Sequence, residues 1–193
     1  NTDKTKESAA RWIENLKKDL GVSHTVAVGI VANLAHESWG MNPAIKQGGV
    51  LGTPQELSGG AVNQSGFGIC QWGEERRSGL ISYAAAQGLP PGSEAAQYGF
   101  IRQELQTQFK SHIEYIKSQV TGSGEAAAKQ AATLFASGGA SLPLPNGLRG
   151  YLAPSQPDVH KRLSWIDAKG EFQVASPADR GSDIATGGSP TAA

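Results

Sequence analysis

The sequence predicts a mainly α-helical protein with a small β-region, an α+β fold in which helices surround a central apolar helix. Apolar residues recur at three- and four-residue spacing over most of the chain, as on the inward face of amphipathic helices. One run, residues 26–35, is apolar almost all round, which indicates a helix surrounded by others. Nine glycines between residues 40 and 73 interrupt this periodicity and favour a short glycine-rich sheet.

The length and charge limit the classes of protein to which this chain can belong. Its 193 residues suffice for one well-packed domain, expected over residues 1–170. The 17 basic and 17 acidic residues balance, so no charged surface favours nucleic acid or a membrane, and no apolar run has membrane-spanning length. The single cysteine, Cys70, excludes an internal disulfide. Stability must therefore come from the packing of the core.

The first two helices follow from apolar spacing and from their end signals. In residues 5–19, apolar side chains including Trp12 alternate with lysines and glutamates, and Gly21 follows as a stop. Ser23 can cap the apolar helix that comes next. We expect Gly40 and Pro43 to end that helix, because proline disfavours helical geometry in the residue before it.

The rest of the chain alternates between a β-region and further helices. Short strands or a hairpin are expected over residues 48–72, where residues 67–72 alternate in character. The helices expected after it span residues 74–87, 93–120 (as one helix, or as two broken near Thr107), 124–137 and 158–168.

Two segments of the C-terminal half lack a helical pattern. Residues 141–157 contain four prolines and predict a long surface connection. Residues 171–193 are dominated by Ser, Pro, Ala, Gly and Thr toward their end, so they bury too little apolar surface to offset the entropy lost on ordering. We predict a flexible tail or linker there.

Glu37 is the candidate catalytic residue. It comes four residues after Asn33 and three after Leu34, on an inward side of the apolar helix and close to its end. Desolvation disfavours the charged form of a carboxylic acid, which keeps such a group protonated and able to act as a general acid. A glutamate in this position can instead be bound by backbone amides or by an arginine, so its neighbours decide between the two interpretations.

Those neighbours resemble the lysozyme-like superfamily, and most closely the phage tail lysozymes, which are related to lytic transglycosylases and goose-type lysozymes. The matching motifs are Glu37-Ser38, Asn42-Pro43, a glycine-rich span, Gly66-Phe67-Gly68-Ile69-Cys70-Gln71-Trp72, then Arg76, Arg77 and Leu80, and finally Gln97 to Glu104-Leu105. The resemblance is dense over residues 26–82, thinner to residue 120 and slight afterwards. It implies an acid at the end of a core helix, facing across a cleft a small sheet whose Gly-x-x-Gln strand lines the sugar site.

The resemblance and the side-chain chemistry together predict the substrate-binding residues. Gln71 can hydrogen-bond sugar hydroxyls or an N-acetyl group, and the resemblance implies that Ser38 of the Glu-Ser motif is a further substrate-binding residue. Trp72 or Trp39 can stack on a pyranose ring, with core packing as the alternative role for either.

The identity of a second catalytic group stays open. Glycosidases with two carboxylates place them about 5 to 10 Å apart, but no aspartate occurs between Asp19 and Asp158. Glu56, Glu74 and Glu75 are possible partners, although Glu74 and Glu75 also suit the start of a helix, near the positive end of its dipole. The alternative to a second carboxylate is a water held by Asn63 or Ser65, or a hydroxyl of the substrate itself.

Arg76 and Arg77 have three possible roles. They can meet anionic groups of a cell-wall polymer, form a solvated helix face, or pair with Glu104.

The activity implied by the resemblance is that of a muramidase, a glycoside hydrolase that cleaves the β-1,4 bond between N-acetylmuramic acid and N-acetylglucosamine. The implied location is the virion, in a phage tail that degrades the bacterial cell wall locally. The implied partners are bacterial peptidoglycan, other tail or baseplate proteins and further domains of the same chain. The alternatives are a lytic transglycosylase with the same acid and a non-catalytic wall-binding or tail-assembly module.

Other chemistries lack their motifs in this sequence. His36-Glu37 is not followed by a histidine at position 40, and the other histidines are scattered, so no metal site and no cofactor are expected. Cys70 lies among apolar residues, where a small buried side chain is the expected role.

Overall fold

The computed structural model describes residues 2–60, 65–136, 145, 147–151 and 159–177. It is mainly helical with one two-stranded antiparallel sheet, which confirms the predicted fold class at that level. The described residues form two compact units. The first contains residues from 1–33 and 104–179, and the second contains residues 34–103. None of the described helices is both long enough and apolar enough to cross a membrane.

The first unit begins with α1, Thr2–Leu20, which confirms the predicted first helix. Its buried apolar side chains are Ala9, Trp12, Ile13 and Leu16, at the predicted spacing. Gly21 follows with φ +65°, a left-handed conformation that glycine adopts without steric cost. The helix therefore ends where the sequence places its stop signal.

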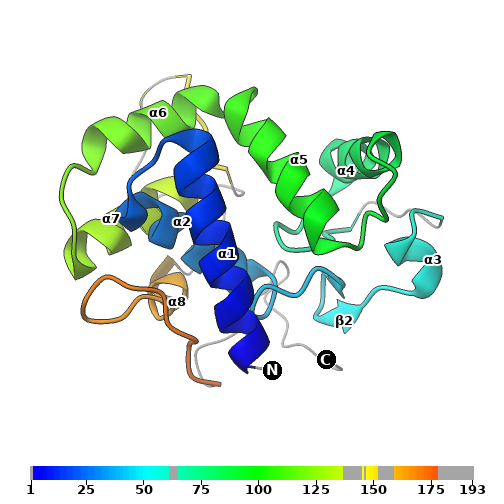
Figure 1. The fold of residues 1–193 in the computed structure, drawn as a ribbon, viewed down its shortest axis with the longest axis horizontal. Helices are drawn as coiled ribbons and strands as arrows, with labels where there is room; N and C mark the ends of the chain where they lie inside the picture. The colour runs from blue at the N-terminus through cyan, green and yellow to red at the C-terminus, as the bar shows by residue number, and fades with distance from the viewer. Residues whose placement is uncertain (1, 61–64, 137–144, 146, 152–158, 178–193) are drawn as a thin grey trace. The chain divides into compact units, whose positions relative to one another are not determined.

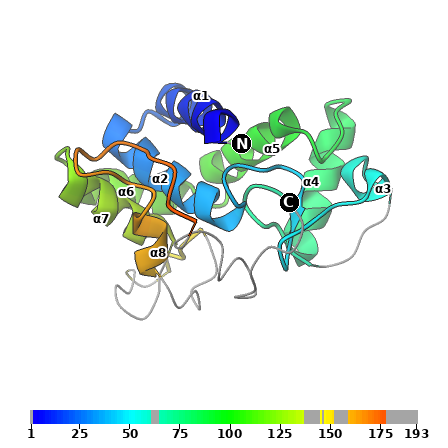
Figure 2. The same ribbon diagram turned by 90° about the horizontal axis from the view of Figure 1, so that it is seen from below.

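Helix α2, His24–Glu37, is the central apolar helix. Ser23 caps it, because its hydroxyl accepts a hydrogen bond from Val26 N–H at 3.1 Å. The side chains of residues 26–35 are all buried, as predicted. At Gly29 the helix lies against α7, Glu125–Ala136: a Cβ on Gly29 would lie 2.6 Å from the backbone nitrogen of Ala132. Helices α2 and α7 are side by side in both views (Figures 1 and 2).

The helical pattern predicted over residues 93–120 corresponds to two helices. Helix α5, Glu94–Gln106, is capped by the Ser93 hydroxyl, and α6, Lys110–Gln119, follows after a break. At the break, Thr107 N–H and Phe109 N–H both donate to Glu104 O. Of the two alternatives, two helices broken near Thr107 is therefore the correct one. Apolar periodicity alone could not decide between them, because the apolar spacing continues through both helices.

The C-terminal part of the first unit departs from the prediction in length. Helix α8, Val159–Leu163, ends five residues before the predicted end. After it, Ile166 forms an isolated β-bridge with Phe172, and the Trp165 and Phe172 rings stack at 5.9 Å. Ordered packing thus continues past residue 170, where the tail was predicted to begin. Most of the predicted surface connection over 141–157 and residues 178–193 of the tail lie outside the described residues.

The second unit contains the predicted β-region, although it begins earlier and includes a helix that was not expected. Strand β1, Ile45–Lys46, pairs with β2, Val50–Leu51, with Ile45 opposite Leu51 and Lys46 opposite Val50. A short helix, α3, Pro54–Leu57, follows. The sequence signal that was missed is a capping box: the Thr53 side chain accepts a hydrogen bond from Glu56 N–H, and the Glu56 side chain accepts one from Thr53 N–H. Pro54 at the start of the helix is a second signal.

Residues 67–72 form a tight hairpin-like turn, which is the hairpin alternative of the prediction. Phe67 and Trp72 form an isolated antiparallel β-bridge and exchange both backbone hydrogen bonds, at 3.0 and 2.9 Å. Gly68, at φ +79°, reverses the chain, and Gln71 N–H donates to Gly68 O at 3.0 Å. The side chains of Phe67, Ile69 and Trp72 are all buried, so the alternation in the sequence is not an alternation of burial.

Helix α4, Glu74–Ala86, completes the second unit together with the first part of α5. Its Leu80 and Ala84 are buried as predicted, whereas Ile81 is half-buried. The core around the turn contains Trp72 and Phe100, whose ring centroids lie 5.7 Å apart. Figure 2 shows α3 and α4 close together, and backbone bonding of Gly92 N–H to Leu57 O at 2.8 Å joins α3 to the loop before α5.

Candidate functional site

Glu37 is the last residue of α2 and is only 2% exposed. It ends a helix whose residues 26–35 are buried and mainly apolar, with Asn33 and His36 as its fully buried polar side chains. A buried acid at a helix end can exchange a proton with a bound substrate while the helix fixes its position. The structure thus gives Glu37 the burial that the sequence predicted.

A tight turn follows Glu37 and is fixed by Ser38. The Ser38 hydroxyl donates to Leu34 O at 2.5 Å and accepts from Met41 N–H at 2.9 Å. The three residues after it all have positive φ, at 57° for Trp39, 92° for Gly40 and 65° for Met41. Such conformations persist only where surrounding structure fixes them. Ser38 is fully buried, so the structure gives its side chain a role in shaping this turn.

Gln71, the predicted substrate-binding glutamine, lies in the turn closed by Phe67 and Trp72. It has φ +51°, and its amide nitrogen donates to Gly68 O at 2.8 Å and to Ile45 O at 3.2 Å. These two bonds join the turn to strand β1. The other amide atom, Oε1, is buried and accepts no hydrogen bond from any described residue. Gln71 therefore has one buried acceptor atom to which no described residue donates a hydrogen bond.

The two candidate tryptophans differ in exposure. Trp72 is fully buried against Phe100, so its ring has no exposed face and packs the core. Trp39, in the turn after Glu37, is half-buried. Of the two, only Trp39 presents part of its ring to a ligand.

Gln97 was quoted in the family motif but was not predicted as a site residue. Its side chain is fully buried and makes three hydrogen bonds: Oε1 accepts from Ile69 N–H at 2.8 Å, and Nε2 donates to Pro43 O at 2.8 Å and Pro91 O at 2.9 Å. It therefore joins α5 to the Gly-x-x-Gln turn and to the segment after Glu37. The signal available in the sequence was a polar residue four positions before Ile101, on the same inward face of the helix.

Glu56 lies in a buried ion-pair network. Its carboxylate accepts from Lys46 Nζ at 2.9 Å and from Arg77 Nη2 at 3.2 Å. Arg77, which is 1% exposed, also donates to Ser65 O at 3.0 Å and lies over the Phe67 ring at 4.6 Å. The expectation that Arg77 forms a solvated helix face was wrong, because its guanidinium is buried and binds Glu56.

These partners determine the ionisation of Glu56. Burial by itself would raise the pKa of this carboxyl group, but hydrogen bonds from Lys46, the Thr53 backbone and Arg77 outweigh it and lower the pKa to about 2. Glu56 is therefore a carboxylate at neutral pH, with both oxygens bound by cations. As the possible second catalytic group, it would have to leave these partners to attack a sugar.

Of the two polar residues expected to hold a water, Ser65 is half-buried and receives the Arg77 hydrogen bonds, and Asn63 lies outside the described residues. Glu74 and Glu75 form the first turn of α4, where acidic side chains suit the positive end of the helix dipole. Cys70 is a free, buried cysteine. In the part of the chain that the structure describes, no three His, Cys, Asp or Glu residues come together as metal ligands.

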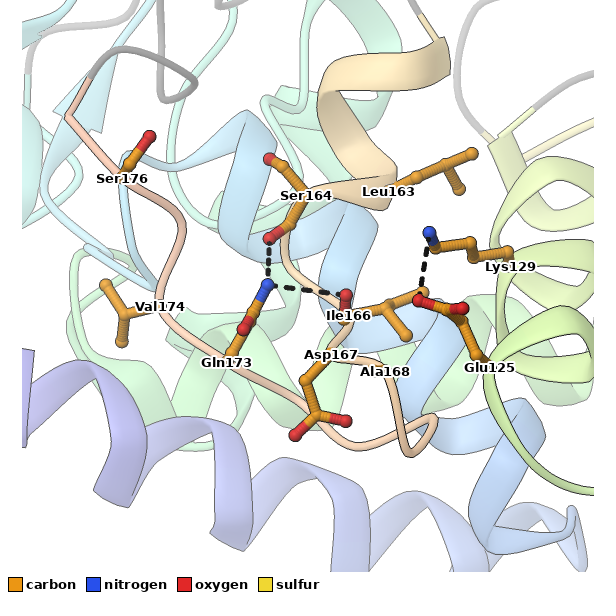
Figure 3. Close-up of a pocket in the computed structure, with 10 residues that line it drawn as sticks. All are labelled: Glu125, Lys129, Leu163, Ser164, Ile166, Asp167, Ala168, Gln173, Val174 and Ser176. Carbon is orange, nitrogen blue, oxygen red and sulfur yellow. Dashed lines mark hydrogen bonds and ion pairs between the residues drawn. The ribbon is translucent and has the colours of Figure 1, made fainter.

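A separate cavity of about 700 Å³ lies in the first unit, near α7 and α8 (Figure 3). Its polar side chains largely bind one another or the local backbone: Lys129 pairs with Glu125 at 3.3 Å, and the Gln173 amide donates to Ser164 O at 2.9 Å. The backbone N–H groups of Glu171 and Lys169 donate to Asp167 and lower the pKa of its carboxyl group. None of the predicted site residues lines this cavity, and we assign it no role in the reaction.

Comparison with known proteins gives one match. The model of a protein family described as phage tail lysozyme matches residues 7–141, well over half of the chain. No curated protein and no solved structure matches. The matched range includes Glu37, the turn that carries Gln71, and Gln97.

Proposed function

Because this chain belongs to the phage tail lysozyme family, which implies peptidoglycan-degrading activity, we propose that it is a muramidase with Glu37 as its general acid. The bond cleaved is the β-1,4 linkage between N-acetylmuramic acid and N-acetylglucosamine. The burial of Glu37 at the end of the mainly apolar helix α2 carries the proposal. A carboxyl group held in place at a helix end can donate a proton to a leaving sugar oxygen.

In the proposed reaction, Glu37 gives its proton to the glycosidic oxygen as the bond between that oxygen and the anomeric carbon breaks. The positive charge that develops on the sugar ring is then quenched by a nucleophile. In hydrolysis a water molecule adds to the anomeric carbon and returns a proton to Glu37. In transglycosylation a hydroxyl of the same sugar attacks instead, forming an anhydro ring, and its proton returns to Glu37.

The ion pairs of Glu56 support a reaction with one catalytic carboxyl group. A nucleophilic carboxylate must approach the anomeric carbon closely, whereas both oxygens of Glu56 are bound by Lys46 and Arg77. Breaking those bonds during each turnover would leave buried Arg77 and half-buried Lys46 without this counter-charge. We therefore propose that water attacks directly, with Ser65 or Asn63 orienting it.

Substrate binding is proposed to involve the two turns that follow this acid in the sequence, at residues 38–41 and 67–72. The open Oε1 of Gln71 accepts a hydrogen bond from a sugar N-acetyl N–H or hydroxyl group. The half-buried ring of Trp39 stacks on a pyranose face. We retain Ser38 and Trp72 as supports for these turns, since both side chains are buried.

The test is the substitution Glu37→Gln, assayed by the release of soluble fragments and new reducing ends from purified peptidoglycan. Loss of the acid should lower the rate by at least about a hundredfold, while the melting temperature stays near or above that of the wild type. The matched control is Glu75→Gln, an exposed glutamate on α4 of the same unit, which should keep full activity. Retention of most activity by the Glu37 variant would exclude this role.

The masses of the released fragments distinguish the alternatives. Fragments with reducing ends indicate hydrolysis, and anhydro ends indicate a lytic transglycosylase that uses the same acid. A wild-type protein that sediments with peptidoglycan and leaves the glycan intact would be a non-catalytic wall-binding or tail-assembly module. That outcome would overturn the proposed activity.

We further propose that the chain acts in the virion, as part of a phage tail that opens the bacterial wall locally. Its partners would then be other tail or baseplate proteins or further domains of the same polypeptide. Immunogold labelling of the particle with an antibody to this domain tests the location. Labelling confined to the lysate and absent from purified particles would contradict it.

A further inference from the structure

A second cavity of the first unit, of about 330 Å³, lies at the start of α6. Its walls include Gln108, Ser111, His112 and Arg149, and the half-buried ring of Phe109 completes one side. None of these residues takes part in the proposed reaction. The cavity is therefore unexplained by the function argued above.

The N-terminus of α6 is open toward hydrogen-bond acceptors. Its N-cap residue, Phe109, provides no side-chain cap. Among the described residues, no group accepts a hydrogen bond from the backbone N–H of Ser111 or of His112. The first N–H groups of a helix and its dipole together attract negative charge. The exposed Lys110 in the first turn adds a positive charge at the same helix end.

His112 provides an independent observation in the wall of this cavity. The residue is 2% exposed, and its Nε2 lies 3.3 Å from Phe135 O, so this nitrogen carries the hydrogen and donates. Nδ1 is then the acceptor of the neutral ring, and it is buried without any hydrogen-bond partner in the described structure. Burial also lowers the pKa of His112, although the backbone carbonyls of Phe135 and Leu134 act in the opposite direction. A buried acceptor without a donor is costly unless a ligand supplies the donor.

The charged groups around the cavity differ in whether other residues already bind them. Arg149 is exposed, and no described residue forms an ion pair or hydrogen bond with its guanidinium. The buried carboxylate of Glu104 is already bound, by the Tyr151 hydroxyl and by Gln108 Nε2 at 3.3 Å. The cavity thus combines an available guanidinium, an open helix N-terminus and a neutral imidazole acceptor.

We propose that this cavity binds a carboxylate group that has an amide N–H or a hydroxyl close to it. The carboxylate binds Arg149 and the open amides of Ser111 and His112, and the neighbouring donor reaches His112 Nδ1. In peptidoglycan, the substrate class on which this inference rests, two groups have this chemistry. One is an N-acetylmuramic acid residue that carries no peptide stem, so that its lactyl carboxylate is free beside its acetamido group, and the other is the C-terminal residue of a peptide stem.

The experiment is an NMR titration of the ¹⁵N-labelled protein that follows the backbone amides of Ser111 and His112 and the ring nitrogens of His112. The probes are N-acetylmuramic acid, N-acetyl-D-alanyl-D-alanine, N-acetylglucosamine and acetate. Saturable shifts with either of the first two are expected, weaker ones with acetate and none with N-acetylglucosamine. Shifts from the sugar acid alone assign the muramic carboxylate, shifts from the dipeptide alone assign the peptide stem, and shifts from both assign their shared chemistry.

Three outcomes would overturn the proposal: no shift with any probe, equal shifts with N-acetylglucosamine, or acetate binding as tightly as the larger acids. None of the probes contains a β-1,4 glycosidic bond, so the titration does not depend on turnover. If the protein degrades peptidoglycan but none of the probes shifts its signals, the proposed function stands and the proposed carboxylate site is excluded.

Two arginine variants identify the group that binds the carboxylate. Arg149→Gln should weaken binding of the active probe about tenfold, because it removes one charge-assisted hydrogen-bonding partner. Arg11→Gln, which changes an exposed arginine on α1, should leave the dissociation constant unchanged. An unaltered dissociation constant in the Arg149 variant would exclude its role.

Discussion

The side-chain oxygen of Gln97 accepts a hydrogen bond from the backbone N–H of Ile69 at 2.8 Å, and the two residues are 28 positions apart in the chain. This bond fixes the Gly-x-x-Gln turn from α5. It is possible only because the glutamine reaches close to the turn at Gly68, where a Cβ atom would lie 2.7 Å from Gln97 Oε1. The conformation of Gln71 therefore depends on a glycine three residues before it and on a glutamine in another helix.

Replacing Gly68 with alanine should destabilise the protein by about 2 to 4 kcal/mol, because it adds both a steric clash and a left-handed conformation that alanine disfavours. It should also lower activity, because the turn that positions Gln71 must shift. Chemical denaturation and the peptidoglycan assay measure the two effects.

Gly48→Ala is the matched control for this change. Gly48 has a similar φ of +89°, but no atom lies within 4 Å of the position that its Cβ would occupy. In this variant the free energy of unfolding should fall by only about 1 to 2 kcal/mol, the cost of placing alanine in a left-handed conformation. Equal losses in the two variants would show that the contact with Gln97 contributes nothing.

Glu56→Gln should destabilise the protein by about 3 to 5 kcal/mol, because it removes the charge that balances buried Arg77 and half-buried Lys46. Urea unfolding at pH 7 measures the loss, with Glu75→Gln as the control. If Glu56 acted as a nucleophile instead, its variant would be inactive and nearly as stable as the wild type.

The pH dependence gives a second measure of the same network. The pKa of Glu56 is about 2 in the folded protein against an ordinary value of 4.5. Below pH 4.5 the unfolded chain binds a proton that the folded protein does not, so stability falls as the pH decreases from about 4.5 toward 2. The Glu56→Gln variant should show a shallower decline over this range.

His112 should make stability depend on pH in a different range. Burial lowers its pKa below the ordinary value of 6.5, so the unfolded chain takes up a proton first as the pH falls. The contribution of His112 is therefore complete above about pH 6.5 and decreases below it. Melting temperatures measured from pH 7.5 to 5 should decline in the wild type and change less in His112→Gln.

An NMR titration of the imidazole makes this prediction independent of how well the His112 variant folds. The midpoint in the wild-type protein should lie below 6.5. A midpoint at or above that value would contradict the burial argument.

The parts of the fold that depend on local sequence were predicted well. Helix α1 and the Ser23 cap of α2 follow from the spacing of apolar residues and from one side-chain oxygen at a helix start. The burial of Glu37 followed in the same way, from its position relative to Asn33 and Leu34. Each of these inferences uses residues within one or two helical turns.

The parts that depend on distant residues were not predicted. The partner that fixes the turn at Gly68 is Gln97 on another helix. The pairing of Arg77 with Glu56 joins residues 21 positions apart, so helical periodicity could not indicate it. The burial of Trp72 likewise comes from Phe100. Tertiary contacts therefore decide which polar and aromatic residues near the candidate site are available to a substrate.

Gly29→Ala tests whether the close contact between α2 and α7 is needed for stability. A Cβ at this position would lie 2.6 Å from Ala132 N and 2.7 Å from Ala131 Cβ, so the two helices would have to separate. Overpacking of this kind costs about 1 to 3 kcal/mol, which exceeds the gain of up to about 1 kcal/mol that alanine brings to a helix interior. Denaturant unfolding should therefore show a net loss. Gly122→Ala, with no atom within 4 Å of its Cβ position, is the control and should change stability by less than about 0.5 kcal/mol. A stabilised Gly29 variant would mean that α7 can move away from α2 at little cost.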